Sequence, residues 1–192
     1  MGAIETISAE LAYIAGAVED TYLGTNKEKG YEFDMESKSK QWLECAIAPR
    51  LAKLTEKLIK VRKRTTRPYY RIRIWNKKLV TTLVSIKEMP TQVLKWSDEF
   101  QLLWVRGFID AEGSVTKSGD NQPMLSVYNK NLQKLKIIEK ILYLYDIKAR
   151  YYKPSTRDVW QQYYTGRSNL STLSETVNIE HPEKSNKLRL YL

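Results

Sequence analysis

The sequence predicts an α+β protein made of two similar halves, each with the order helix–strand–strand–helix–strand–strand–helix. Two apolar segments, residues 10–22 and 103–114, each carry a central glycine and end in acids, and one begins each half. Helical and alternating apolar patterns then follow both segments in the same order. With 192 residues, 42% of them hydrophobic, the chain is long enough to bury a substantial core.

The segment at 103–114 is expected to be a helix buried against another helix. Its apolar residues wrap nearly the whole helix and are Leu103, Trp104, Phe108 and Ile109. Gly107 costs about 1 kcal/mol there relative to alanine, which indicates a place where two backbones come close. We expect Gly113 to end the helix in a left-handed conformation. Glu112 would then lie at the negative end of the helix dipole, where a cation would stabilise it.

The segment at 10–22 is a second version of this helix. Ser8 is a suitable N-cap, and Gly16 takes the place of Gly107, 91 residues later. Further along, Lys38 and Lys130 are 92 residues apart, and neighbouring glutamines and leucines match at the same offset. One residue is therefore missing from the first copy between Gly16 and Lys38.

This missing residue decides which residue is the partner of Glu112. An ungapped match from the glycines gives Thr21, whereas the offset of 92 gives Asp20. We favour Asp20 because it restores a carboxylate. It also places each acid 18 residues before its lysine, Lys38 or Lys130.

The remaining elements follow from alternation, helical spacing and turn residues. In the first half we expect strands at 22–25 and 31–36 around a turn at 26–30, a helix at 40–57 with Pro49 inside it as a candidate kink, strands at 58–64 and 68–75, and a helix at 76–87. In the second half we expect strands at 113–118 and 122–128 around a turn at 119–121, a helix at 131–145, strands at 147–153 and 159–165, a helix at 168–177 and a helical tail from 180. The halves are then residues 1–88 and 97–192, joined by a linker at 89–96.

Composition limits the class of protein. A formal charge of +10 and a pI near 9.5 favour a polyanionic partner. The single cysteine, Cys45, excludes an internal disulfide and fits a reducing compartment, and the single histidine, His181, leaves no His/Cys metal site. No apolar run is long enough to span a membrane and no leader is evident. We therefore expect an intracellular protein of the cytoplasm or nucleoid that is not secreted.

The two motifs resemble a known family signature. Arg106-Gly-Phe-Ile-Asp-Ala-Glu-Gly113, repeated in weaker form at Ala15-Gly-Ala-Val-Glu-Asp20, is similar to the motif of LAGLIDADG homing endonucleases of the single-chain, double-motif type. Archaeal intron-encoded members are the most similar. The resemblance implies two pseudo-symmetric αββαββα halves, with the motif helices packed at the centre and the antiparallel sheets forming a DNA-binding saddle.

The resemblance also implies a function. It is that of a monomeric, metal-dependent endodeoxyribonuclease, a hydrolase that acts in intron homing without a protein or membrane partner. Such an enzyme cuts double-stranded DNA at a long asymmetric target and leaves short 3′ overhangs. The alternative is an intron RNA maturase that uses the same fold without cleavage, which the weaker first motif keeps open. A transcriptional regulator is less favoured because no helix-turn-helix pattern accompanies the repeat.

The expected catalytic centre combines acids and lysines. Asp20 and Glu112 are the expected ligands of Mg²⁺, which prefers oxygen ligands and keeps some waters. Mn²⁺ or Ca²⁺ is expected to substitute in binding. By resemblance, the main-chain carbonyls of Glu19 and Ala111 complete the shell. Lys38 and Lys130 match the family's basic residues near each scissile phosphate, where an ammonium orients water or stabilises charge.

The outward faces of the strands are expected to bind DNA, because a two-stranded ribbon fits the major groove. Alternation selects Arg62, Arg64, Arg71, Arg73 and Trp75 in the first half, and Gln122, Met124, Ser126, Tyr128, Lys148, Arg150, Tyr152 and Lys153 in the second. The acidic strand at 32–36 is unusual on such a surface. It is expected either to read cytosine amino groups or to repel wrong sequences.

Overall fold

The computed structural model describes residues 7–26, 30–119, 121–155 and 158–192. Residues 27–29 of the first expected turn and Asp120 of the second lie outside the described residues. In chain order the first elements are α1 (Ala9–Ala17), β1 (Tyr22–Asn26), β2 (Gly30–Ser37), α2 (Lys40–Trp42), the π-helix η1 (Leu43–Ile47), α3 (Ala48–Thr55), β3 (Arg62–Lys63), β4 (Tyr70–Trp75) and α4 (Lys77–Glu88). They continue as the 3-10 helix η2 (Pro90–Lys95), α5 (Asp98–Glu112), β5 (Gly113–Lys117), β6 (Pro123–Asn129), α6 (Leu132–Tyr143), β7 (Arg150–Tyr152), β8 (Trp160–Thr165), α7 (Arg167–Val177) and α8 (Pro182–Tyr191).

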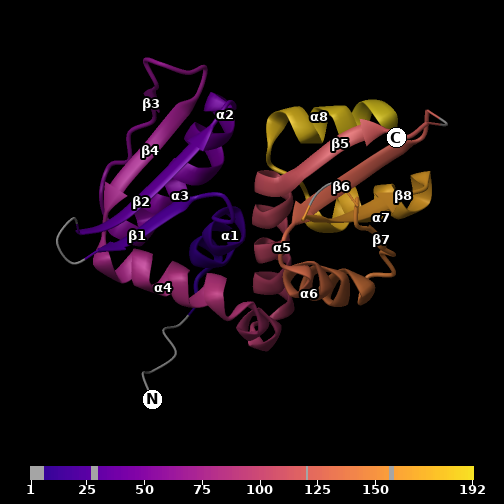
Figure 1. Cartoon of the computed structure of the whole chain (residues 1–192), viewed down its shortest axis with the longest axis horizontal. Helices are drawn as coiled ribbons and strands as arrows, with labels where there is room; N and C mark the ends of the chain where they lie inside the picture. The colour runs from indigo at the N-terminus through magenta and orange to yellow at the C-terminus, as the bar shows by residue number, and fades with distance from the viewer. Residues whose placement is uncertain (1–6, 27–29, 120, 156–157) are drawn as a thin grey trace.

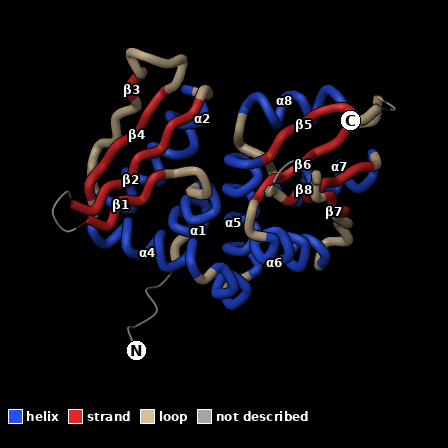
Figure 2. Tube along the Cα trace, in the orientation of Figure 1, coloured by secondary structure: helices blue, strands red, loops and turns tan. Residues whose placement is uncertain are grey.

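Two antiparallel four-stranded sheets flank a central pair of helices (Figures 1 and 2). The N-terminal sheet has the order β1-β2-β4-β3 and the C-terminal sheet the order β5-β6-β8-β7, so the two sheets have the same topology. Every strand neighbour is antiparallel. The predicted α+β class with two matching sheets is therefore confirmed.

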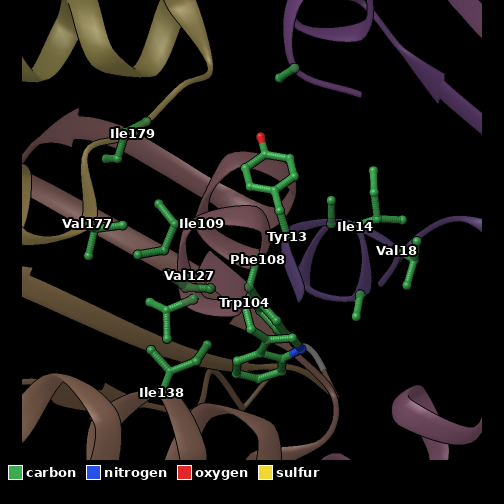
Figure 3. Close-up of a cluster of buried hydrophobic side chains, with 14 of the residues drawn as sticks. Tyr13, Ile14, Val18, Trp104, Phe108, Ile109, Val127, Ile138, Val177 and Ile179 are labelled. Atoms are coloured by element: carbon green, nitrogen blue, oxygen red, sulfur yellow. The ribbon is translucent and has the colours of Figure 1, made fainter. Parts of the chain in front are cut away.

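The central pair, α1 and α5, packs with the two backbones in contact. A Cβ on Gly16 would lie 2.0 Å from the carbonyl oxygen of Trp104, and one on Gly107 would lie 2.1 Å from that of Tyr13. Figure 3 shows Tyr13 and Ile14 of α1 beside Phe108 of α5 in the buried cluster. The glycine in each segment therefore marks the close approach that its sequence predicts.

The left-handed ending predicted at Gly113 is wrong. Gly113 has φ −72° and ψ 151°, an extended conformation, and it is the first residue of β5, where it pairs with Val127. A Cβ at this position would lie 2.4 Å from the carbonyl oxygen of Ile109. Glycine is thus required for a close approach between helix end and strand, and not for a positive φ.

The helix at 40–55 contains a π-helical stretch that ends at Ile47, two residues before Pro49. Proline has no N–H group to donate to the carbonyl four residues earlier, and widening of the preceding turn accommodates this loss. The helix ends at Thr55, before the predicted boundary at 57. The C-cap residue Glu56 adopts a left-handed conformation with φ 54°.

Two edge strands are shorter than predicted. β3 covers only Arg62–Lys63 of the expected 58–64, and β7 covers only Arg150–Tyr152 of the expected 147–153. Strand pairing is limited to the residues that meet β4 and β8, and Leu58 is instead 84% exposed. Side-chain alternation continues past the point where backbone pairing stops, which is why the sequence overestimates both strands.

The predicted helical tail is present as α8, which lies along β5 in Figure 1 and contributes buried Leu188 to the core. The linker region contains η2, in which Pro90 and Val93 are buried. Among the described residues, no helix has both the length and the apolar character needed to cross a membrane.

Candidate active site

The acids at the ends of the two motif segments line one cavity of about 140 Å³. Asp20 follows α1, whereas Glu112 is the last residue of α5. The other lining residues come from both motif segments, β2, α2 and the start of α8, and they are Ala17, Thr21, Met35, Glu36, Ser37, Trp42, Asp110, Ala111 and His181. The repeat thus brings one acid from each motif to a shared position, which we call the acid centre.

The strand pairing locates the missing residue of the first motif. Tyr22 pairs with Asp34, and Ser114 pairs with Ser126, the counterpart of Asp34 in the second sheet. Counted back from these strands, Asp20 and Glu112 hold equivalent positions. Counted forward from the motif glycines, Thr21 is the equivalent residue, and the two counts differ because α1 ends at Ala17 and a turn of residues 18–20 follows.

Glu112 lies in an electrostatically unfavourable environment. Burial raises the pKa of its carboxyl group from 4.5 to about 7, and the negative charges of Asp20 and Glu19 add to the rise. Lys184 and Lys87 act in the opposite direction. The carboxylate therefore depends on nearby positive charge, as its place at a helix C-terminus also requires.

Two lysines from other elements bind the carbonyl ends of the motif helices. Lys87, on α4, donates from Nζ to the carbonyl oxygens of Val18, at 3.1 Å, and Glu19, at 2.6 Å. Lys184, on α8, donates to those of Ile109, Asp110 and Ala111, at 3.1, 2.5 and 3.1 Å. Both ammonium groups occupy positions that favour a cation, because helix C-termini carry a partial negative charge.

Burial lowers the pKa of both lysines, to about 8 for Lys184. Nearby acids oppose this effect and favour the charged forms. The acids that raise the pKa of Lys87 are Glu19, Asp20 and Glu112. Those that raise the pKa of Lys184 are Asp110, Glu112 and Glu183. The two ammonium groups are thus linked electrostatically to the same acid centre.

Each motif also carries a second acid just before its residue of the acid centre. The side chain of this second acid contacts a residue of the opposite half of the chain. Glu19 forms a buried ion pair with Lys134, at 2.8 Å, and accepts a hydrogen bond from Asn129 at 3.0 Å. Both side chains of the ion pair are only 7% exposed. These contacts join the end of the first motif to the start of α6.

Asp110 plays the corresponding part in the second motif. It accepts hydrogen bonds from the hydroxyl of Tyr13 at 2.7 Å and from the backbone N–H groups of Glu180 and His181. The Tyr13 hydroxyl in turn accepts from the indole N–H of Trp42 at 2.9 Å. Both motif ends are therefore fixed by contacts across the central helix pair.

The remaining predicted centre residues do not all meet there. Ala111 lines the cavity, and the Glu19 carbonyl lies at the same helix end, bonded to Lys87. Lys38 and Lys130 are exposed and lie outside the cavity lining. Each directly precedes the N-cap residue of a helix, α2 or α6. The Nζ atom of Lys38 lies 5.7 Å from the ring centroid of Tyr69.

The oxygen donors fit a hard cation. Two carboxylates and two main-chain carbonyls belong to the two helix ends, and ammonium groups already bind those carbonyls. In the part of the chain that is described, no group of three or more Asp, Glu, His or Cys side chains could hold a metal. Further ligands would therefore have to come from water and substrate oxygen.

The predicted DNA-facing residues lie on two sheets that differ in chemistry, since those of the N-terminal sheet are mainly arginines. On the N-terminal sheet, Arg71 and Arg73 lie on the face opposite buried Ile72, and Arg73 lies 5.0 Å from the ring centroid of Trp75. The other predicted residues of this sheet region, Arg62 and Arg64, lie at its β3 edge; Arg62 is exposed, and Arg64 forms an ion pair with Glu36 at 3.2 Å.

On the C-terminal sheet, Met124, Ser126 and Tyr128 lie on the face opposite buried Leu125 and Val127, but Ser126 is itself buried and, of these three, only Met124 and Tyr128 are accessible. Arg150 and Tyr152 are exposed on β7, and Gln122 and Lys148 lie just outside the strands. Lys153 also follows β7 and forms an exposed ion pair with Asp158 at 3.3 Å.

The sequence does not predict the roles of Lys87 and Lys184. These lysines lie on α4 and α8, elements remote in sequence from the acids that they serve, and no repeat or periodicity relates them to those acids.

Comparisons with known proteins agree with this geometry. Residues 99–178 match a family described as LAGLIDADG-like domain. The chain is 27% identical over 191 residues to homing endonuclease I-ApeI of Aeropyrum pernix, covering 93% of this chain and 85% of I-ApeI. These matches confirm the LAGLIDADG resemblance.

Solved structures share the fold. I-DmoI, in complex with DNA and Mn, superposes with a TM-score of 0.70 at 18% identity, covering 90% of this chain and 97% of that one. The N-terminal LAGLIDADG domain of DUF199/WhiA superposes with a TM-score of 0.56 at 14% identity, covering 94% and 89%. At these identities the likeness concerns the fold alone.

Proposed function

Because residues 99–178 form a LAGLIDADG-like domain and the chain is homologous to a homing endonuclease, we propose that it is a site-specific DNA endonuclease. The observation that carries the proposal is the acid centre, where Asp20 and Glu112 line one cavity between two matching sheets. Paired carboxylates held between two similar DNA-binding surfaces suit hydrolysis of both strands of a duplex. The proposed units are residues 1–88 and 97–192, joined by 89–96.

Asp20 and Glu112 hold Mg²⁺ in this proposal, with the carbonyl oxygens of Glu19 and Ala111 as further donors. Homologous structures that contain Mn and Ca support the use of a divalent metal. Bound Mg²⁺ would supply Lewis-acid stabilisation for the charge that develops on the phosphate. The strand register supports Asp20 over Thr21, as does the requirement for a charged ligand.

The lysines have two separate roles. Lys87 and Lys184 neutralise the carbonyl ends of the motif helices and hold the last turns in place, so that the two acids keep their relative positions. Lys38 and Lys130, which are exposed at the starts of α2 and α6, contact the DNA backbone beside the scissile phosphates. There their ammonium groups stabilise charge or orient water.

The monomer binds a long asymmetric duplex along the outward faces of both sheets. The predicted readers on these faces are chemically different in the two sheets, which accounts for an asymmetric target. Cleavage of both strands leaves short 3′ overhangs. The net charge of +10 supports phosphate contacts along this surface.

Cleavage of the joined exon sequence that flanks the protein's own intron tests the proposal. Wild-type protein with Mg²⁺ should cut both strands and leave short 3′ overhangs. Asp20→Asn should abolish cleavage but spare binding measured in Ca²⁺, while the control Glu44→Gln, an exposed acid paired with Lys40, should cut normally. Full activity of Asp20→Asn would move the role to Glu19 or Thr21.

An RNA maturase is the second candidate. The first motif lacks the terminal glycine, and α1 ends before the acids, whereas α5 continues through Glu112. Tight, Mg²⁺-independent binding of intron RNA without cleavage of the exon junction would favour this candidate and reject the endonuclease.

A further inference from the structure

On the outward faces of the two sheets, equivalent positions hold cross-strand pairs of different side chains. In the N-terminal sheet, Arg71 lies opposite Glu36 and diagonal to Asp34. In the C-terminal sheet, Gln161 lies opposite Tyr128 and diagonal to Ser126. Since the two sheets have the same strand order, the pairs Arg71–Asp34 and Gln161–Ser126 occupy equivalent positions.

Each diagonal pair is joined by hydrogen bonds. Arg71 donates from Nε to Asp34 Oδ1 at 2.5 Å and from Nη2 to Asp34 Oδ2. Gln161 donates from Nε2 to Ser126 Oγ at 2.8 Å. The longer side chain of each pair is therefore held in one orientation by the shorter one.

The shorter side chain lies beneath the longer one. The side chain of Asp34 is 13% exposed and that of Arg71 22%, and Ser126 is 1% exposed whereas Gln161 is half-buried. Asp34 is thus too covered to read a base itself, and its charge disfavours a phosphate near Arg71. Its position suits orientation of the guanidinium instead.

The unused hydrogen-bonding groups of each pair match different bases. After its two bonds to Asp34, Arg71 keeps both N–H groups of Nη1 and one of Nη2, which suit the paired acceptors O6 and N7 of guanine. After its bond to Ser126, Gln161 keeps one N–H donor and its carbonyl acceptor. This combination suits N7 and the N6 amino group of adenine.

We propose that Arg71, oriented by Asp34, reads a guanine in one half of the target, and that Gln161, oriented by Ser126, reads an adenine at the symmetry-related position of the other half. Asp34 and Ser126 are positioning residues in this scheme. The inference rests on the proposed DNA-binding function, because it assigns bases to two positions of that target.

The test is selection of DNA from a pool of randomised duplexes in Ca²⁺, followed by affinities for the selected site and its single-base variants. Wild-type protein should discriminate roughly ten- to hundredfold at each of the two positions. The double variant Asp34→Ser/Arg71→Gln copies the C-terminal pair, and it should change guanine to adenine at the first position only. Ser126→Asp/Gln161→Arg should make the converse change at the other position.

A positioning role for Asp34 has its own readout. Asp34→Asn should lower the preference for guanine while raising affinity for unrelated DNA, because a negative charge near the phosphates is removed. A purely structural role would instead lower affinity for every sequence equally. As the folding control, each variant should keep the wild-type base preference in the other half of the site.

Two results would overturn the inference. An identical selected sequence for wild-type protein and both swapped variants would show that these pairs do not read bases. Selection of a site without guanine and adenine at symmetry-related positions would also show that these pairs do not read those bases, and it would leave the endonuclease proposal intact. Failure to select any sequence would instead reject the proposed DNA-binding function together with the inference.

Discussion

Substitution of Gly16 by alanine should test the packing that brings the two motif ends together. The added Cβ would lie 2.0 Å from the carbonyl oxygen of Trp104 and 2.9 Å from the backbone nitrogen of Phe108. Both atoms belong to the backbone of α5, so no side chain can move aside to make room. The helices must separate by about 1 Å to bring the shorter distance to even 3.0 Å.

The expected loss of stability combines two opposing effects. Overpacking of a well-packed core typically costs about 1–3 kcal/mol, and a backbone clash belongs at the upper end of that range. Alanine is favoured over glycine inside a helix by about 1 kcal/mol. The free energy of unfolding of Gly16→Ala should therefore fall by about 2 kcal/mol, which lowers Tm by about 4–8 °C in a chain of this size.

Thermal and urea unfolding of Gly16→Ala measure this loss, with Gly119→Ala as the matched control. A Cβ on Gly119 would have no neighbour within 4 Å, so this variant should unfold as the wild type does. An unfolding free energy for Gly16→Ala within 0.5 kcal/mol of wild type, a margin typical of neutral surface changes, would refute the close packing of α1 and α5.

Two further predictions concern buried charges. Lys134→Met should lower the free energy of unfolding by about 3–5 kcal/mol, because it leaves the buried Glu19 carboxylate without its counter-charge and with only the hydrogen bond from Asn129. Adding Glu19→Gln should restore much of the loss in urea unfolding, and an equally unstable double variant would contradict the argument. Burial lowers the pKa of His181 from 6.5 to about 4, so the unfolded chain binds a proton first as the pH falls. The stability that His181 contributes is therefore complete above pH 6.5 and is lost as the pH falls toward 4. His181→Gln should show a shallower decline over this window, and identical pH profiles would contradict the assignment.

The central helix pair was predictable because its signal is local. Gly16 and Gly107 each lie within an apolar helical pattern, and acids follow each glycine within five residues. The repeat offset then linked the two segments and led to Asp20 as the partner of Glu112. Such periodic signals depend on residues within one or two turns of a helix.

Contacts between distant elements were not predictable in this way. The bonds from Lys87 and Lys184 to the motif helices join segments about 70 residues apart, and no periodicity relates them. The role of Gly113 was also misjudged, since a glycine after a helix suits both a left-handed cap and a tight helix-to-strand junction. The φ of −72° at Gly113 and the short distance to the carbonyl of Ile109 distinguish the two in the structure.

The central claim is that the acid centre cleaves DNA, and the single-turnover cleavage rate of Glu112→Gln tests it most directly. Wild type and variant are compared with Mg²⁺ on the same exon-junction duplex, with binding measured separately in Ca²⁺. We expect the variant to bind the duplex as tightly as the wild type and to lose cleavage of both strands. Cleavage by Glu112→Gln at the wild-type rate would show that the acids at the ends of α1 and α5 are not the catalytic centre.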